Sequence, residues 1–114
     1  MNGRLDEAQD LIRRGVNINY RDSSWGGYTA LMCAAVDGHS ECIQLLITAG
    51  CDLNIQNKSG WTALIYAATC GHSESVQQLI TAGCDLNIQD EWGNTALILA
   101  AYKGHSESVQ LLIT

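Results

Sequence analysis

The sequence predicts an all-α solenoid, a single domain over residues 1–114 in which helix-turn-helix units stack and β-hairpin-like loops project from them. One observation is a Gly-x-Thr-Ala-Leu motif that recurs every 33 residues, at 27–31, 60–64 and 93–97. The other is a Gly-His-Ser-Glu motif that follows each copy, at 38–41, 71–74 and 104–107. A fixed period of this length is typical of repeat proteins, in which each unit buries its apolar face against its neighbours.

The first helix of a unit is marked at both ends. In the central unit Thr62 is the expected N-cap, because its hydroxyl can accept a hydrogen bond from the free N–H groups at the start of a helix. The following run 63–68, Ala-Leu-Ile-Tyr-Ala-Ala, favours a helix, and Gly71 ends it. Isolated helices shorter than about 12 residues are not stable in water. Packing against neighbouring units must therefore stabilise this one.

The second helix follows directly. Ser73 and Glu74 suit its first turn, where a carboxylate interacts favourably with the positive end of the helix dipole. Residues 76–81 continue the helix, and Gly83 ends it in the left-handed conformation that glycine adopts without strain. Residues 84–90 then alternate apolar and polar side chains, which predicts an extended arm and a tight turn of the Asx type.

The repeat boundaries divide the chain into four parts. Residues 1–21 are predicted to be a half repeat with only a second helix and a loop, followed by repeats at 22–56 and 57–89 and by residues 90–114, a repeat truncated after its second helix. Terminal repeats of solenoids normally carry a polar outer face, which neither end shows here. We therefore expect either a fragment of a longer array or end-to-end self-association through uncapped terminal repeats.

Charge and composition exclude several kinds of partner. The net charge is −6, from 12 acidic and 6 basic residues, and the bases are scattered. Binding to nucleic acid needs clustered Lys and Arg, so no nucleic-acid partner is expected. No apolar run is long enough to predict a membrane span. The five cysteines, an odd number without paired spacing, favour a reducing compartment and a cytoplasmic location.

No residue pattern indicates chemistry. Nothing resembles a nucleophile with its base, a phosphate-binding glycine loop or a cofactor motif, so we expect no enzyme, no catalytic residue, no cofactor and no metal site. The histidines recur one per repeat, too far apart to share an ion at Zn–N distances of about 2 Å. We interpret them as structural residues at the helix junctions; they are His39, His72 and His105. Cys51 and Cys84 occupy equivalent positions, where a free cysteine acts as a small packing residue.

Taken together, the motifs resemble the ankyrin repeat over the whole chain. The likeness rests on Gly-x-Thr-x-Leu, paired alanines, Gly-His, and an apolar helix before Gly-x-Asp-x-Asn. The family's Thr-Pro-Leu-His is Thr-Ala-Leu-Met at 29–32 and Thr-Ala-Leu-Ile at 62–65 and 95–98, and the chain has no proline. We expect apolar side chains to replace the family's histidine by packing; they are Met32, Ile65 and Ile98. The resemblance implies a concave face of loop tips and first helices that binds protein partners.

Aromatic residues occupy the positions at which the repeats differ, and the resemblance places these positions on the concave face. Aromatic side chains are enriched in binding hot spots. The predicted partner-binding residues are Trp25, Tyr28, Lys58, Trp61, Tyr66, Glu91, Trp92, Asn94, Tyr102 and Lys103. The alternative is that the tryptophans only shield neighbouring loops, as single surface aromatics often do.

The sequence therefore predicts a non-catalytic module that binds an unidentified protein. The alternative is a structural spacer that sets distance and curvature within a large array protein and has no partner of its own. The ankyrin resemblance also marks Asn54 and Asn87 as positions that an oxygenase hydroxylates in this family. Their structural interpretation is that the asparagine side chain bonds loop amides.

Overall fold

The computed structural model describes residues 17–23 and 26–114. In this part of the chain every helix belongs to a pair joined by a short turn. The helices are α2 (Ala30–Asp37), α3 (Ser40–Thr48), α4 (Ala63–Thr69), α5 (Ser73–Thr81), α6 (Ala96–Lys103) and α7 (Ser106–Ile113). The predicted half repeat falls largely outside the described residues.

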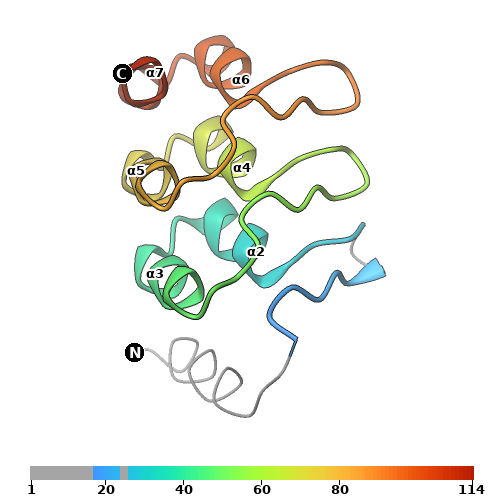
Figure 1. Ribbon diagram of the computed structural model, residues 1–114. Helices are drawn as coiled ribbons and strands as arrows, with labels where there is room; N and C mark the ends of the chain where they lie inside the picture. Colours follow the sequence, from blue (N-terminus) through green and yellow to red (C-terminus); the bar gives the residue numbers. More distant parts are fainter. Residues whose placement is uncertain (1–16, 24–25) are drawn as a thin grey trace.

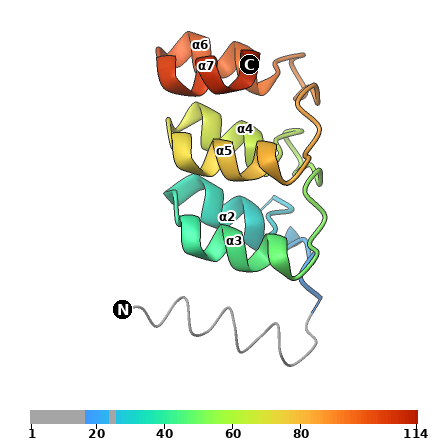
Figure 2. The same cartoon turned by 60° about the vertical axis from the view of Figure 1, so that its left-hand side comes forward.

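The three pairs stack on one another, and the segments between pairs project to one side (Figure 1). A view turned by 60° shows the same layers edge on (Figure 2). Each helix packs against its partner within the pair and against the equivalent helix of the next pair. The predicted all-α solenoid of stacked helix-turn-helix units is therefore confirmed. We call the projecting segments 51–61 and 84–94 fingers.

The sequence signals for the helix ends are confirmed. Thr62 caps α4, since its hydroxyl accepts a hydrogen bond from the N–H of Ile65 at 3.2 Å, and Thr29 and Thr95 cap α2 and α6 in the same way. Gly71 follows α4 with φ of 75°, a left-handed conformation that would strain any residue with a Cβ. Short helices thus begin and end where their own residues dictate.

Small and branched apolar side chains fill the space between the pairs. Ala35, Ala67, Ala68 and Ala100 of the first helices are completely buried, which lets neighbouring backbones approach closely. Met32 and Ile65 are each 1% exposed, so the prediction that they pack in place of a histidine is confirmed. For Ile98 that prediction is wrong: it is 49% exposed, because no described helix pair covers its side of α6.

Main-chain hydrogen bonds join successive fingers at their tips. The N–H of Lys58 donates to the carbonyl of Gly26 at 2.9 Å, and the N–H of Glu91 donates to that of Ser59 at 3.0 Å. The hairpin character is limited to one antiparallel bridge between Asp22 and Tyr28, with no strand elsewhere in residues 17–23 and 26–114. Within the same residues, no helix has the length and apolar character needed to span a bilayer.

Candidate functional site

A polar side chain closes the turn of each finger. Asn57 Oδ1 accepts hydrogen bonds from the main-chain N–H groups of Ser59 and Trp61, at 3.0 and 2.9 Å. Asp90 Oδ1 accepts from the second and fourth residues after it, at 2.9 and 2.8 Å. This geometry confirms the predicted Asx turn. The turn also fixes Trp61, whose ring then packs against the first helix of the repeat.

Three aromatic side chains from two repeats meet beside this turn; we call Tyr28, Trp61 and Tyr66 the aromatic cluster. The ring centroids of Tyr28 and Tyr66 lie 5.3 Å apart, and those of Trp61 and Tyr66 lie 4.8 Å apart in an edge-on arrangement. Both separations are typical of favourable aromatic pairs. All three side chains are half-buried and pack on the core. The cluster is therefore held in one arrangement while part of it stays open to solvent.

A chain of hydrogen bonds runs through the cluster. Asn57 Nδ2 donates to the Tyr66 hydroxyl oxygen at 2.7 Å, and the Tyr66 hydroxyl donates to that of Tyr28 at 2.6 Å. Burial, followed by the hydrogen bond to Tyr28, raises the pKa of the Tyr66 phenol above its ordinary value. Tyr66 therefore stays neutral and keeps its proton.

Asp90 ties the next finger to the cluster. Trp61 Nε1 donates to Asp90 Oδ2 at 3.0 Å, a contact between residues one repeat apart. Desolvation acts to raise the pKa of the Asp90 carboxyl, but hydrogen bonds from the main-chain N–H groups of Asn94 and Trp92 and from the Trp61 indole outweigh it. The net effect is a pKa below the usual value, so Asp90 is a carboxylate at neutral pH.

The remaining predicted residues are spread over the last repeat and the finger tips. Trp92 and Tyr102 are 71% and 83% exposed, and neither has a ring contact within the described chain. Lys58, Glu91 and Lys103 are exposed and Asn94 is half-buried, whereas Trp25 lies outside the described residues. The structure thus brings together Tyr28, Trp61 and Tyr66, and the other predicted residues that it describes lie outside the aromatic cluster.

Asparagines connect the bases of the fingers. Asn54 Oδ1 accepts from the N–H of Asp85 at 2.8 Å, and Asn19 Oδ1 makes the equivalent bond to Asp52 at 2.7 Å. The prediction that Asn54 bonds a loop amide is confirmed. Asn87 is exposed, and no N–H group of the described residues donates to its side chain.

The fingers also carry an open hollow of about 570 Å³. Its walls include the cations Arg21 and Lys58, the amides of Gln56 and Gln89, and the acid Glu91. Gln56 Nε2 bridges two fingers by donating to the carbonyls of Gly60 and Gln89, at 2.9 and 3.0 Å. The hollow is polar and carries both signs of charge, and it shares Asn57 and Asp90 with the cluster side.

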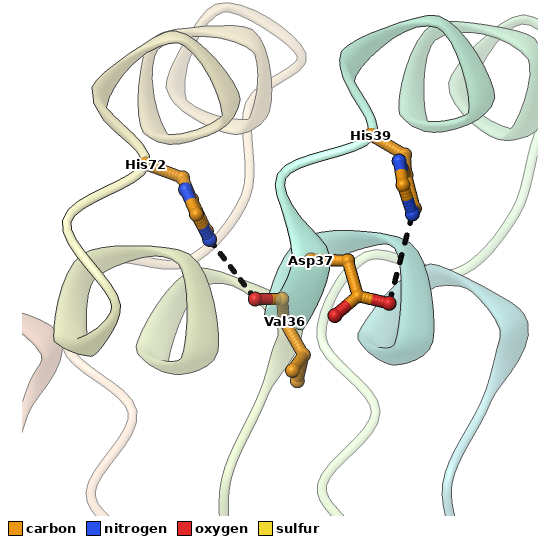
Figure 3. A network of polar contacts seen from close by, with 4 residues as sticks. All are labelled: Val36, Asp37, His39 and His72. Carbon is orange, nitrogen blue, oxygen red and sulfur yellow. Dashed lines mark hydrogen bonds and ion pairs between the residues drawn. The ribbon is translucent and has the colours of Figure 1, made fainter.

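The histidines lie at the helix junctions, as predicted. His72 Nε2 lies 2.9 Å from the carbonyl oxygen of Val36 in the preceding repeat (Figure 3). Because a carbonyl only accepts, Nε2 must carry the proton in this bond. His105 makes the same bond to Thr69 at 3.0 Å, whereas His39 lies 3.6 Å from the Asp37 carboxylate. Each repeat junction described here is therefore joined by one imidazole.

All five cysteines are free thiols; two are buried, two are exposed, and Cys42 is half-buried. Cys51 and Cys84 are 9% and 8% exposed, so their predicted role in packing is confirmed. Burial, and then the charge of Asp85, raises the pKa of the Cys84 thiol to about 11. Cys33 and Cys70 are exposed. Across residues 17–23 and 26–114, no group of three or more metal-ligating side chains is assembled.

Sequence reasoning missed the polar partners of the aromatic cluster. Asn57 and Asp90 are variants of one recurring position, three residues before the glycine of the Gly-x-Thr-Ala-Leu motif. The available signal was the exchange of Asn for Asp at this position between two otherwise similar repeats. Asn57 meets a hydroxyl that accepts its N–H, and Asp90 meets an indole that donates.

The fold and the site define a class of protein: a helical repeat solenoid with an aromatic cluster on the side of its first helices and fingers. The family model for ankyrin repeats (3 copies) matches residues 1–90 and again residues 69–114. The chain belongs to the ankyrin repeat family. Ankyrin repeats generally mediate protein–protein interaction, and the family is generally non-catalytic.

Curated relatives match parts of the chain. Notch-regulated ankyrin repeat-containing protein of Homo sapiens is 38% identical over 58 residues, which are 49% of this chain and 51% of that protein. Ankyrin repeat domain-containing protein 29 of Danio rerio is 40% identical over 57 residues, 49% of this chain and 18% of that protein. NAD-capped RNA hydrolase NUDT12 of Homo sapiens is 53% identical over 38 residues, 33% of this chain and 8% of that protein. The chain spans at most about half the length of these relatives.

Proposed function

We propose that this chain is a non-catalytic protein-interaction module that binds a protein partner through its concave face, formed by the finger tips and by α2, α4 and α6. The aromatic cluster is the observation that carries the proposal. Its rings are fixed by hydrogen bonds from Asn57 and to Asp90, so little conformational entropy is lost when a partner packs on them. Preorganised, half-buried aromatic side chains are the kind of residue that dominates binding energy at interfaces.

The last repeat supplies the exposed part of the proposed surface. Trp92 and Tyr102 together offer two large, accessible rings. Exposed Lys58, Glu91 and Lys103 form a polar rim that selects between partners more than it adds affinity. Trp25 and Asn94 complete the proposed set.

The test uses the exposed rings, because alanine at Trp61 or Tyr66 would also remove contacts to the core. The full chain and a Trp92→Ala, Tyr102→Ala variant are compared by proximity labelling and pull-down from a lysate of the source cells. The matched control is Glu74→Ala, Gln77→Ala, which removes two exposed side chains of α5, a second helix. We expect one set of partners that the control retains and the variant loses, with unfolding midpoints unchanged by more than a few degrees. Identical partners for all three proteins would favour the spacer.

The proposal also covers the cellular location, the repeat boundaries, hydroxylation and self-association. We infer a cytoplasmic setting, repeat boundaries at 22, 57 and 90, and an accessible Asn87 as the better of the two candidates for hydroxylation, since Asn54 already bonds its neighbour. Mass spectrometry of the native protein would detect the added oxygen.

End-to-end self-association would use the uncovered side of the last repeat, where Leu97, Ile98 and Ile113 are exposed. Sedimentation of wild type and Ile98→Glu tests it, since only wild type would form dimers.

A further inference from the structure

The hydroxyls of the aromatic cluster hold one more proton than they can use between themselves. Asn57 Oδ1 accepts two main-chain N–H groups, so its amide cannot be flipped, and Nδ2 faces Tyr66 as a donor. Tyr28 and Tyr66 have one hydroxyl proton each, and only one proton can lie in the 2.6 Å bond between their oxygens. The second proton has no acceptor among the described residues. With Asn57 donating to Tyr66, it is the proton of Tyr28 that is left over.

We propose that this hydroxyl pair is a hydrogen-bond-donating subsite for a peptide segment of the partner, which places a neutral carbonyl oxygen on the Tyr28 hydroxyl and an apolar side chain on the rings of Trp61 and Tyr66. The inference rests on the proposed function, since it concerns the same face. It goes further because it states which chemical group the partner must offer. A donor of the partner at this point would meet another donor and lose a hydrogen bond.

The charges around the cluster favour a neutral carbonyl over a carboxylate. Asp90 holds the Trp61 indole at 3.0 Å and is ionised, and the net charge of the chain is −6, so a carboxylate would be repelled. The cations nearest to the cluster along the chain are Lys58, which lines the hollow, and Arg21. Its neighbour Asp22 pairs with Tyr28 in the antiparallel bridge, and successive side chains of an extended segment alternate. Arg21 therefore emerges on the opposite side from Tyr28, and lines the hollow behind the fingers.

The chain itself offers a substitution that removes the spare proton. Asp90 occupies the position of Asn57 in the next repeat and closes the same turn through Oδ1, so Asn57→Asp is compatible with the finger. An aspartate at 57 would accept one hydroxyl proton through its second oxygen. The other proton would lie between the two tyrosines, and the pair would no longer donate outward. Asn57→Asp thus removes the outward hydrogen-bond donor of the hydroxyl pair, while the shape of the side chain and the contacts between the rings stay the same.

The experiment uses synthetic peptides as probes. Twelve-residue peptides are selected from a random phage-displayed library on the full chain, and those that shift the NMR signal of the Trp61 indole N–H are kept. Dissociation constants are then measured for wild type, Tyr28→Phe and Asn57→Asp. The controls are Tyr20→Phe, which removes a hydroxyl of a side chain that is 63% exposed and lies outside the proposed binding set, and Ser59→Asp, which adds a nearby charge without touching the pair. Circular dichroism confirms that each variant is folded.

We expect Tyr28→Phe and Asn57→Asp each to weaken binding about three- to tenfold, the usual worth of one hydrogen bond, and both controls to bind as wild type does. If Asn57→Asp does not fold, Tyr28→Phe decides alone. Equal binding by all variants would overturn the donor subsite and leave the proposed concave interface standing. Selected peptides that all leave the Trp61 signal unmoved, and shift residues of the hollow or of α5 instead, would overturn both.

Discussion

Residues 62–65 and 95–98 have the same sequence, Thr-Ala-Leu-Ile, and the same capping hydrogen bond, yet their environments differ. In α4, Leu64 and Ile65 are 2% and 1% exposed, whereas in α6, Leu97 and Ile98 are 36% and 49% exposed. The helix α4 lies between α2 and α6, and among the described helices nothing covers the far side of α6 (Figure 1). A repeat therefore determines its own helices, but its neighbour determines how much they bury.

The largest expected effect comes from replacing the equivalent isoleucine of each repeat by alanine. Ile65→Ala should lower the free energy of unfolding by about 3 kcal/mol, because it removes buried methylenes and leaves a cavity between α4 and its neighbours. Ile98→Ala should cost less than about 1 kcal/mol, since half of that side chain is already in water. Urea unfolding of both variants measures the difference. Equal losses would mean that α6 is covered in solution, for example by a second molecule.

The next test compares two glycines after the first helices. Gly71 and Gly104 both have positive φ, but a Cβ at Gly71 would lie 2.7 Å from the ring of His105, whereas one at Gly104 would meet nothing within 4 Å. Gly104→Ala should cost about 1 kcal/mol from backbone strain alone. Gly71→Ala should cost about 1 to 2 kcal/mol more, because it also displaces the imidazole from the Thr69 carbonyl. Thermal unfolding of the pair is the measurement, and identical midpoints would contradict it.

A third test exchanges the turn residue of the last finger for that of the middle one. Asn at 57 faces a hydroxyl that accepts, but Asp90→Asn would set an amide N–H against the Trp61 indole N–H. We expect a loss of about 1 to 2 kcal/mol in the free energy of unfolding. Glu91→Gln, which makes the same change from carboxyl to amide at the exposed neighbouring residue, is the control.

The difference in stability between wild type and Asp90→Asn should also depend on pH. The pKa of Asp90 is lower in the folded chain than in the unfolded one, so its contribution is present above the unfolded pKa, near about 3.9, and is lost as pH falls through the folded value. The difference in stability between wild type and Asp90→Asn should therefore narrow as the pH falls below about 5 and through the folded pKa. A constant difference over this range would show that the charge of Asp90 is not what holds the indole.

The smallest expected effect is a gain in the free energy of unfolding that should be equal in the two repeats. Ser75 and Ser108 are each 1% exposed, and their hydroxyls have no hydrogen-bond partner among the described residues. Ser108 stays buried in the last repeat, so this position faces the preceding one. Alanine at either site should raise the free energy of unfolding by roughly 0.5 to 1 kcal/mol, since an unsatisfied buried hydroxyl is removed. A gain at Ser75 alone would mean that Ser108 is hydrated.

Signals that act within one repeat could be predicted from the sequence. Thr62 as a cap and Gly71 as a stop concern hydrogen bonds and backbone angles within a few residues, and both are confirmed. The packing of Cys51 and Cys84 followed in the same way from their recurrence.

Contacts between repeats could not be predicted in the same way. The bond from Trp61 to Asp90 and the Tyr28–Tyr66 pair join residues 29 and 38 positions apart, offsets that differ from the period by several residues. These offsets depend on how successive fingers are oriented relative to one another, which follows from the tilt between helix pairs. Ile98 shows the same limit, because its burial depends on a neighbour and not on its own motif.

The polar bonds between units also determine how the chain would respond to force. Each described unit is joined to the next by its own small set, such as His105 to Thr69 and Asn54 to Asp85. Stretched along the stack, a unit can yield only after its own set of bonds to a neighbouring unit has broken. Each 33-residue unit would release about 110 Å of slack as it gave way, at about 3.3 Å per extended residue. Because the units have the same length, the chain would extend under force in steps of equal size.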